Sequence, residues 1–230
     1  MLKHTKMVLV GGWCLVLFAI LFVGHTLIVN ALAQSQAELY NLKNQLFQVT
    51  AGTPTIRLLL TFYALLPLLI IPGAVGAFYL FQENHGANMQ VGLCFALIGT
   101  ISLSVSLLML PSLNWHLTSW IPTLPKEAQE TMIVLLQAIH SYFGIFLGDL
   151  LGLGCIFIWF LITSFVILRD NSLPRVVGTI QLIIAILAIF LLGLRDSGLL
   201  PNIYNNVQVS GLFALWIFIF GISMISLHKD

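Results

Sequence analysis

The sequence predicts an all-α fold, a single polytopic membrane helix bundle of about six transmembrane helices that occupies residues 1–230. Its composition carries this prediction first. Hydrophobic residues make up 59% of the chain and charged residues only 7%, a balance that suits a protein whose solvent is lipid. The net charge is only +1, which leaves no basic face, so we expect no nucleic-acid partner.

The second observation is a series of six apolar runs, each long enough for the roughly 20 residues that a helix needs to cross a bilayer. They place the spans at residues 7–33, 57–81, 89–110, 142–168, 176–194 and 207–227. The fourth span has an uncertain start, because an unbroken helix from Glu130 to Leu168 would be about 58 Å long. We therefore expect a break or a lipid-surface segment near residues 137–141.

The first run resembles a secretory signal, with Lys3 and Lys6 before it and Ala31-Leu32-Ala33 at its end. It is longer than the usual apolar core of a signal peptide, so we expect a retained first helix.

The distribution of Lys and Arg predicts the orientation, because these residues favour cytoplasmic loops. With the N-terminus in the cytoplasm, the basic residues inside are Lys3, Lys6, Arg169, Arg175 and Lys229, and those outside are Lys43, Arg57, Lys126 and Arg195. The inside residues include two paired clusters near the membrane. We predict that the N- and C-termini are both cytoplasmic.

Two longer connections then fall on the outer side. Within residues 36–50, apolar side chains recur at three-four-three spacing from Leu39 to Val49, which predicts an amphipathic extracytoplasmic helix between spans 1 and 2. The connection at residues 111–126 carries Trp115 and Trp120, and such rings are typical of the headgroup level.

Helix packing is predicted from small residues four apart, which let backbones approach closely in lipid. The row formed by Gly144, Gly148 and Gly152 places the fourth span at the centre of the bundle. Pro67 and Pro72 predict a kink in the second span.

Polar residues gather toward the outer end of the predicted bundle. Asp149 lies about 10 Å into the fourth span, where a carboxylate needs a partner, and Arg57 is the partner that we favour. One interpretation is a buried ion pair that fixes helix register. The other is an outward-facing polar pocket that binds a ligand or relays a proton, lined by Arg57, His140, Asp149, His25, Tyr63 and Arg195.

Metal or haem binding has weaker support in the sequence, and no cofactor is evident. His25 and His140 could converge from different helices to hold haem or a metal. His140 and Asp149 are nine residues apart, on opposite faces of a continuous α-helix, which argues against joint ligation. His4, His85 and His228 lie at termini or loop tips and give no signal of such a site, and we expect the three cysteines to be buried packing residues.

Motifs of soluble enzymes are absent: the sequence has no GxSxG, HExxH or P-loop pattern. This argues strongly against a soluble enzyme and less against an intramembrane enzyme, whose site is assembled from scattered polar residues. The placement of the polar residues toward one end favours a non-enzymatic ligand-binding or accessory subunit, with the bilayer, other membrane subunits or a lipid ligand as partners. The alternatives are an intramembrane enzyme acting on a lipid or isoprenoid, a haem-binding protein, and a small transporter.

The segment Ser172-Leu173-Pro174-Arg175-Val176-Val177-Gly178 follows one long apolar run and precedes another. Together with Pro54-x-x-Arg57 at the second span and His140 before the fourth, it resembles the bacterial membrane proteins grouped as domain of unknown function 4386. The resemblance implies an inner-membrane six-helix bundle and no established activity.

Overall fold

The computed structural model describes residues 2–34, 54–114, 116, 120–170, 172–196 and 206–227, and every regular element within these ranges is a helix. Some side chains near the ends of these ranges are not described. The amphipathic helix predicted over residues 36–50 and Trp115 lie outside the described residues.

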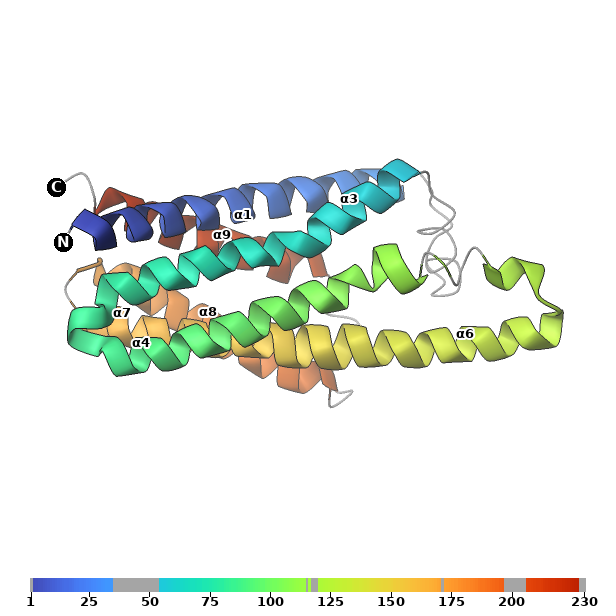
Figure 1. Ribbon diagram of the computed structural model, residues 1–230. Helices are drawn as coiled ribbons and strands as arrows, with labels where there is room; N and C mark the ends of the chain where they lie inside the picture. Colours follow the sequence, from blue (N-terminus) through green and yellow to red (C-terminus); the bar gives the residue numbers. More distant parts are fainter. Residues whose placement is uncertain are drawn as a thin grey trace.

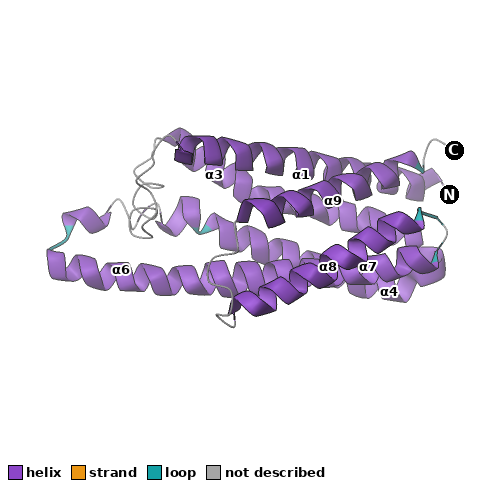
Figure 2. Cartoon of the chain, turned by 180° about the vertical axis from the view of Figure 1, so that it is seen from behind, coloured by secondary structure: helices purple, strands orange, loops and turns teal. Residues whose placement is uncertain are grey.

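The helices form an elongated bundle of antiparallel elements (Figures 1 and 2). Their bounds, in chain order, are α1 Leu2–Gln34, α3 Pro54–Leu65, the 3₁₀ turn η1 Leu66–Leu69, α4 Ile70–Leu108, η2 Leu110–Asn114, η3 Ile121–Thr123, α6 Lys126–His140, η4 Ser141–Leu153, α7 Gly154–Arg169, α8 Arg175–Asp196 and α9 Asn206–Ser226. Helix α1 begins and α9 ends at the same end of the bundle, which we call the termini end; the opposite end is the distal end.

Four described helical segments are long and apolar enough to cross a membrane: Lys6–Ile28, Arg57–Leu113, Lys126–Arg169 and Arg175–Leu192. A fifth apolar stretch, Phe213–Ser226, is shorter. The outer faces are apolar as well; on α8 an exposed stripe at alternating spacing of four and three consists of Val176, Ile180, Ile183, Leu187 and Phe190. Such stripes are too extensive for a soluble monomer, and they make this a membrane-embedded helix bundle.

The segment Arg57–Leu113 is one helical run of 57 residues, about 85 Å if straight, but it folds back on itself at His85. This residue has the non-helical dihedrals φ −135° and ψ 28°, and Figure 1 shows the two antiparallel arms on either side of it. This reversal at His85 falls in the gap between the predicted second and third spans. The 3₁₀ turn at Leu66–Leu69, which contains Pro67, lies within the first arm.

The segment Lys126–Arg169 is helical along all of its 44 residues, about 66 Å, so the break expected near residues 137–141 is wrong. The backbone instead changes from α-helix to π-helix at Ser141. The hydrogen bond from the Gly154 N–H to the Asp149 carbonyl is of the i→i+5 type that defines a π-helix. The wider π-helix keeps the backbone N–H and C=O groups of this segment hydrogen-bonded, so the chain needs no break.

Glycines set the closest approaches between helices. A Cβ on Gly11 of α1 would lie 2.6 Å from the Pro72 carbonyl oxygen and 3.0 Å from the Gly76 Cα, both in α4. A Cβ on the next residue, Gly12, would lie 2.9 Å from the carbonyl oxygen of Gly221 in α9. Consecutive glycines therefore seat α1 between two partners, the kind of contact that small residues permit in lipid.

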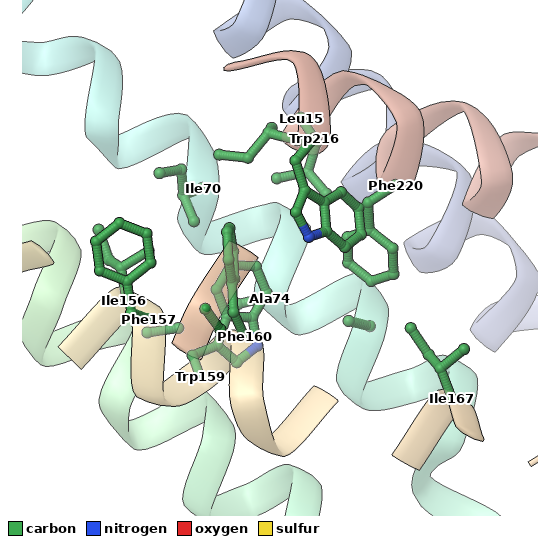
Figure 3. Close-up of a cluster of buried hydrophobic side chains, with 14 of the residues drawn as sticks. Leu15, Ile70, Ala74, Ile156, Phe157, Trp159, Phe160, Ile167, Trp216 and Phe220 are labelled. Carbon is green, nitrogen blue, oxygen red and sulfur yellow. The ribbon is translucent and has the colours of Figure 1, made fainter. Parts of the chain in front are cut away.

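The core of the bundle is aromatic where α7 meets α9 (Figure 3). The ring of Phe160 lies 5.2 Å from that of Trp159 and 5.6 Å from that of Trp216, between centroids. Phe220 closes the cluster, 4.9 Å from Trp216 and 6.5 Å from Trp159. All four side chains are nearly fully buried, so this cluster packs α7 against α9.

Candidate functional site

The predicted polar residues of the distal end belong to α1, α3, the end of α6, η4 and the end of α8. Arg57, in the first turn of α3, is half-buried, and its Nε donates a hydrogen bond to the Pro111 carbonyl 2.9 Å away. This bond ties the start of the first arm to the end of the second. The ion pair of Arg57 with Asp149 stays a prediction.

His25 and Tyr63 are brought together. Their rings are stacked, with centroids 3.9 Å apart and planes inclined by 12°, and Phe22 stacks on the same tyrosine at 5.7 Å. The Nε2 atom of His25 is buried and has no hydrogen-bond partner within the described part of the chain. The pair therefore packs α1 on α3.

The π-helical segment changes the relation between His140 and Asp149. With i→i+5 hydrogen bonds, a π-helix has roughly four to five residues per turn, so nine residues make about two turns. The two side chains therefore share one face, and the expectation of opposite faces, which assumed an α-helix, is wrong. Both are half-buried.

The imidazole of His140 extends along this face. The three atoms nearest to a Cβ placed on Gly144 all belong to the His140 ring, at 3.4–3.6 Å, so the ring lies over the next turn, in the direction of Asp149. Its Nδ1 atom is buried, with no hydrogen-bond partner among the described residues. Gly144 thus makes room for the histidine ring.

The opposite face of η4 is apolar and exposed, at Tyr142, Phe146 and Leu150. Gly148 and Gly152 lie on the side that packs on α4, where a Cβ on Gly152 would lie 3.1 Å from the Leu103 nitrogen and a Cβ on Gly148 would overlap Ser106. Asp149 therefore lies away from the surface that faces lipid in a membrane.

The structure does not bring His25 near His140. Helix α1 and helix α6, which ends at His140, lie along opposite sides of the bundle in both views (Figures 1 and 2). Within the described ranges no three His, Cys, Asp or Glu side chains gather as a metal site would require. Arg195 belongs to α8, but its side chain is not among those described.

A second polar cluster, which the sequence did not predict, lies at the termini end between two turns. Asp170, directly after α7, is only 8% exposed. The Ser172 N–H donates a hydrogen bond of 2.8 Å to its Oδ1, the Ser172 hydroxyl donates to the same oxygen, and the Asn84 amide donates to Oδ2 at 3.3 Å. His85 Nε2 lies 3.8 Å from Oδ2. The fold-back of α4 is thereby joined to the α7–α8 turn.

These contacts also set the charge of the cluster. Burial raises the pKa of the Asp170 carboxyl, but the hydrogen bonds from Ser172 and Asn84, with a smaller electrostatic contribution from the neighbouring His85, together outweigh it. The net result is a pKa below the ordinary carboxyl value, so Asp170 is a carboxylate at neutral pH.

The sequence carried no signal for His85, which the structure places beside Asp170. A signal for Asp170 was present in the sequence: Asp170-Asn171-Ser172 is an Asx-type turn pattern, in which the carboxylate takes the N–H two residues on. Nothing in the sequence indicated that His85 would meet it from a turn 85 residues earlier.

Comparison with known proteins finds no match. No family model, no curated protein and no solved structure matches this chain. The resemblance to domain of unknown function 4386 therefore stays a hypothesis carried by the Leu-Pro-Arg-x-x-Gly turn. At that turn α8 begins at Arg175, and a Cβ on Gly178 would lie 2.9 Å from the Ile167 side chain, so the glycine packs α8 on α7.

Proposed function

We propose that this protein is a non-enzymatic ligand-binding or accessory subunit of the bacterial inner membrane, with six spans, cytoplasmic termini and a polar pocket that opens outward at the distal end. Six crossings follow when the two arms on either side of His85 are counted separately and α9 is added. An even number agrees with α1 beginning and α9 ending at one end of the bundle. The resemblance to domain of unknown function 4386 is part of the same proposal.

The observation that carries the pocket is the shared face of His140 and Asp149 on the π-helical segment. π-Helical turns inside α-helices occur frequently at functional sites, and a carboxylate at membrane depth is costly unless it is paired or hydrated. On the same face, the buried Nδ1 of His140 has no hydrogen-bond partner among the described residues, so it is available to a ligand. Two turns of helix separate the residues by about 10 Å, enough for a small polar group between them.

The test is to purify the protein gently and identify what accompanies it, by mass spectrometry for lipids and small molecules and by an optical spectrum for haem or metal. The proposal expects a bound molecule that is lost from the Asp149→Asn and His140→Ala variants. Tyr142→Phe is the matched control, because Tyr142 lies on the opposite, exposed face of the same segment. Equal retention by all three variants would contradict the proposal.

An intramembrane enzyme acting on a lipid or isoprenoid is the second candidate, and the same shared face favours it. A histidine and a carboxylate about 10 Å apart can act as general base and acid on opposite sides of one substrate. Turnover of a lipid or isoprenoid by the purified protein that stops in Asp149→Asn, with folding intact, would select the enzyme over the binding protein. Turnover unchanged in that variant would exclude Asp149 from catalysis.

A further inference from the structure

A groove with one apolar and one polar part lies at the termini end, along α7. Its apolar part has a volume of about 320 Å³ and is lined by Ile162, Phe165 and Val166, with His85 and Asn88 on the α4 side. Its polar part, about 470 Å³, is lined by Asn84, His85, Arg169, Asp170 and Ser172. His85 and Arg169 line both parts, so the two are continuous.

The apolar part follows one face of a helix. Ile162, Phe165, Val166 and Arg169 stand at the i, i+3, i+4 and i+7 positions, which share a face. They extend over about 10 Å of the helix axis. Phe165 is 52% exposed although it is large and apolar, so this wall of the groove faces the space that lipid chains fill.

The exposed charge of the polar part is positive. Arg169 is exposed and takes part in no ion pair within the described residues, whereas the buried Asp170 already receives hydrogen bonds from Ser172 and Asn84 and lies beside His85. The neighbouring carboxylate on the fold-back, Glu83, lines neither part of the groove. Guanidinium groups bind phosphate oxygens with paired N–H donors.

We propose that this groove binds one anionic phospholipid, with its phosphate on Arg169 and an acyl chain along Ile162, Phe165 and Val166. The order of the residues along α7 carries the assignment: the apolar positions lie one and two turns deeper in the bundle than the arginine. An amphiphile with a charged head and an apolar tail matches both parts, whereas a soluble anion would use only the polar part. This site is separate from the distal pocket and does not depend on it.

The experiment measures lipid retention by native mass spectrometry of the detergent-solubilised full chain. The probes are dioleoyl phosphatidylglycerol, dioleoyl phosphatidylcholine, which has the same chains and no net charge, and glycerol 3-phosphate, which has the charge and no chains. Each is measured on the unsubstituted protein, on Arg169→Gln and on Arg175→Gln. Arg175 is the matched control, since it is an exposed arginine at the same end that does not line the groove.

The expected result is one phosphatidylglycerol retained in preference to phosphatidylcholine, with an affinity about tenfold lower in Arg169→Gln, as loss of a charge-assisted hydrogen bond predicts, and unchanged in Arg175→Gln. Equal losses in both variants would mean general attraction to basic residues and would overturn the proposal. Equal retention of the two lipids by the unsubstituted protein would overturn it without any variant. Binding of glycerol 3-phosphate as tight as that of the lipid would remove the role of the apolar wall.

Discussion

The contact between α1 and α4 should not accept even one additional methyl group at Gly11. The nearest atoms to a Cβ there are backbone atoms of the partner helix, the Pro72 carbonyl oxygen at 2.6 Å and the Gly76 Cα at 3.0 Å. The first distance is 0.8 Å shorter than the 3.4 Å at which ordinary contact begins. Because no side chain can rotate away, Gly11→Ala must push the two helices apart.

Gly24→Ala is the matched control, because Gly24 lies in the same helix and a Cβ there would meet nothing within 4 Å. Both substitutions gain the same helix propensity of up to about 1 kcal/mol, so that gain cancels in the comparison. What remains is the cost of overpacking, about 1–3 kcal/mol. At about 2–4 °C for each kcal/mol in a chain of this size, Gly11→Ala should melt about 2–12 °C below Gly24→Ala.

The assay is thermal unfolding of both variants in the same detergent, followed by tryptophan fluorescence and checked by size-exclusion chromatography. A midpoint for Gly11→Ala equal to or above that of Gly24→Ala would refute the packing of α1 on α4.

Three further predictions concern other parts of the bundle. Gly99→Ala, whose Cβ would lie 2.7 Å from the Gly152 carbonyl oxygen, should lower the melting temperature more than Gly144→Ala, whose Cβ would meet only the His140 ring at 3.4 Å; the reverse order would contradict the contact between η4 and α4. Because folding lowers the pKa of Asp170, its contribution to stability is complete above the ordinary carboxyl pKa of 3.8 and is lost as the pH falls through the lower folded-state value. Asp170→Asn should therefore be less stable than the unsubstituted protein at pH 7 and approach it below pH 3.8, and a pH-independent difference in melting temperature would refute this. Gln181→Leu should be neutral or stabilising by up to about 3 kcal/mol, since the Gln181 side chain is fully buried and its amide has no partner in the described part of the chain; a lower melting temperature would show that the amide is satisfied.

The helical class and the positions of the apolar runs followed from the sequence because hydropathy acts over 20 residues at a time. The fold-back at His85 fell where the runs at 57–81 and 89–110 leave a gap. The π-helix at Ser141 was not predicted, because the same apolar and glycine-rich residues suit an α-helix equally well. Whether His140 and Asp149 lie on the same face of the helix depends on whether the segment is α-helical or π-helical.

The glycine contacts of α1 were also missed. Gly11 and Gly12 are adjacent, not four apart, so the small-residue pattern did not mark them. Each contacts a different helix, an arrangement that a pattern for one pair of helices cannot find.

The prediction that all three cysteines are buried is correct for one of them. Cys155 is buried, Cys14 is half-buried and Cys94 is exposed, although all three lie in apolar runs.

The Asp170 cluster was beyond sequence analysis for a simple reason. Its members come from two turns separated by two transmembrane-length helices, and only their meeting at the termini end makes them a site. Local rules could identify the Asp170–Ser172 turn, but the contact with His85 depends on how α4 packs on α7.

The most direct test of the distal pocket compares cysteine accessibility at two adjacent positions of η4 in membranes, in a background that lacks Cys14, Cys94 and Cys155. Asp149→Cys should react with a water-soluble maleimide added from the outer side of the membrane, because its face is polar and turned away from lipid. Leu150→Cys should not react, since Leu150 is 47% exposed on the apolar face of η4, where lipid keeps the water-soluble reagent away. Equal labelling of the two cysteines, or labelling of Asp149→Cys only from the cytoplasmic side, would contradict an outward-facing polar pocket.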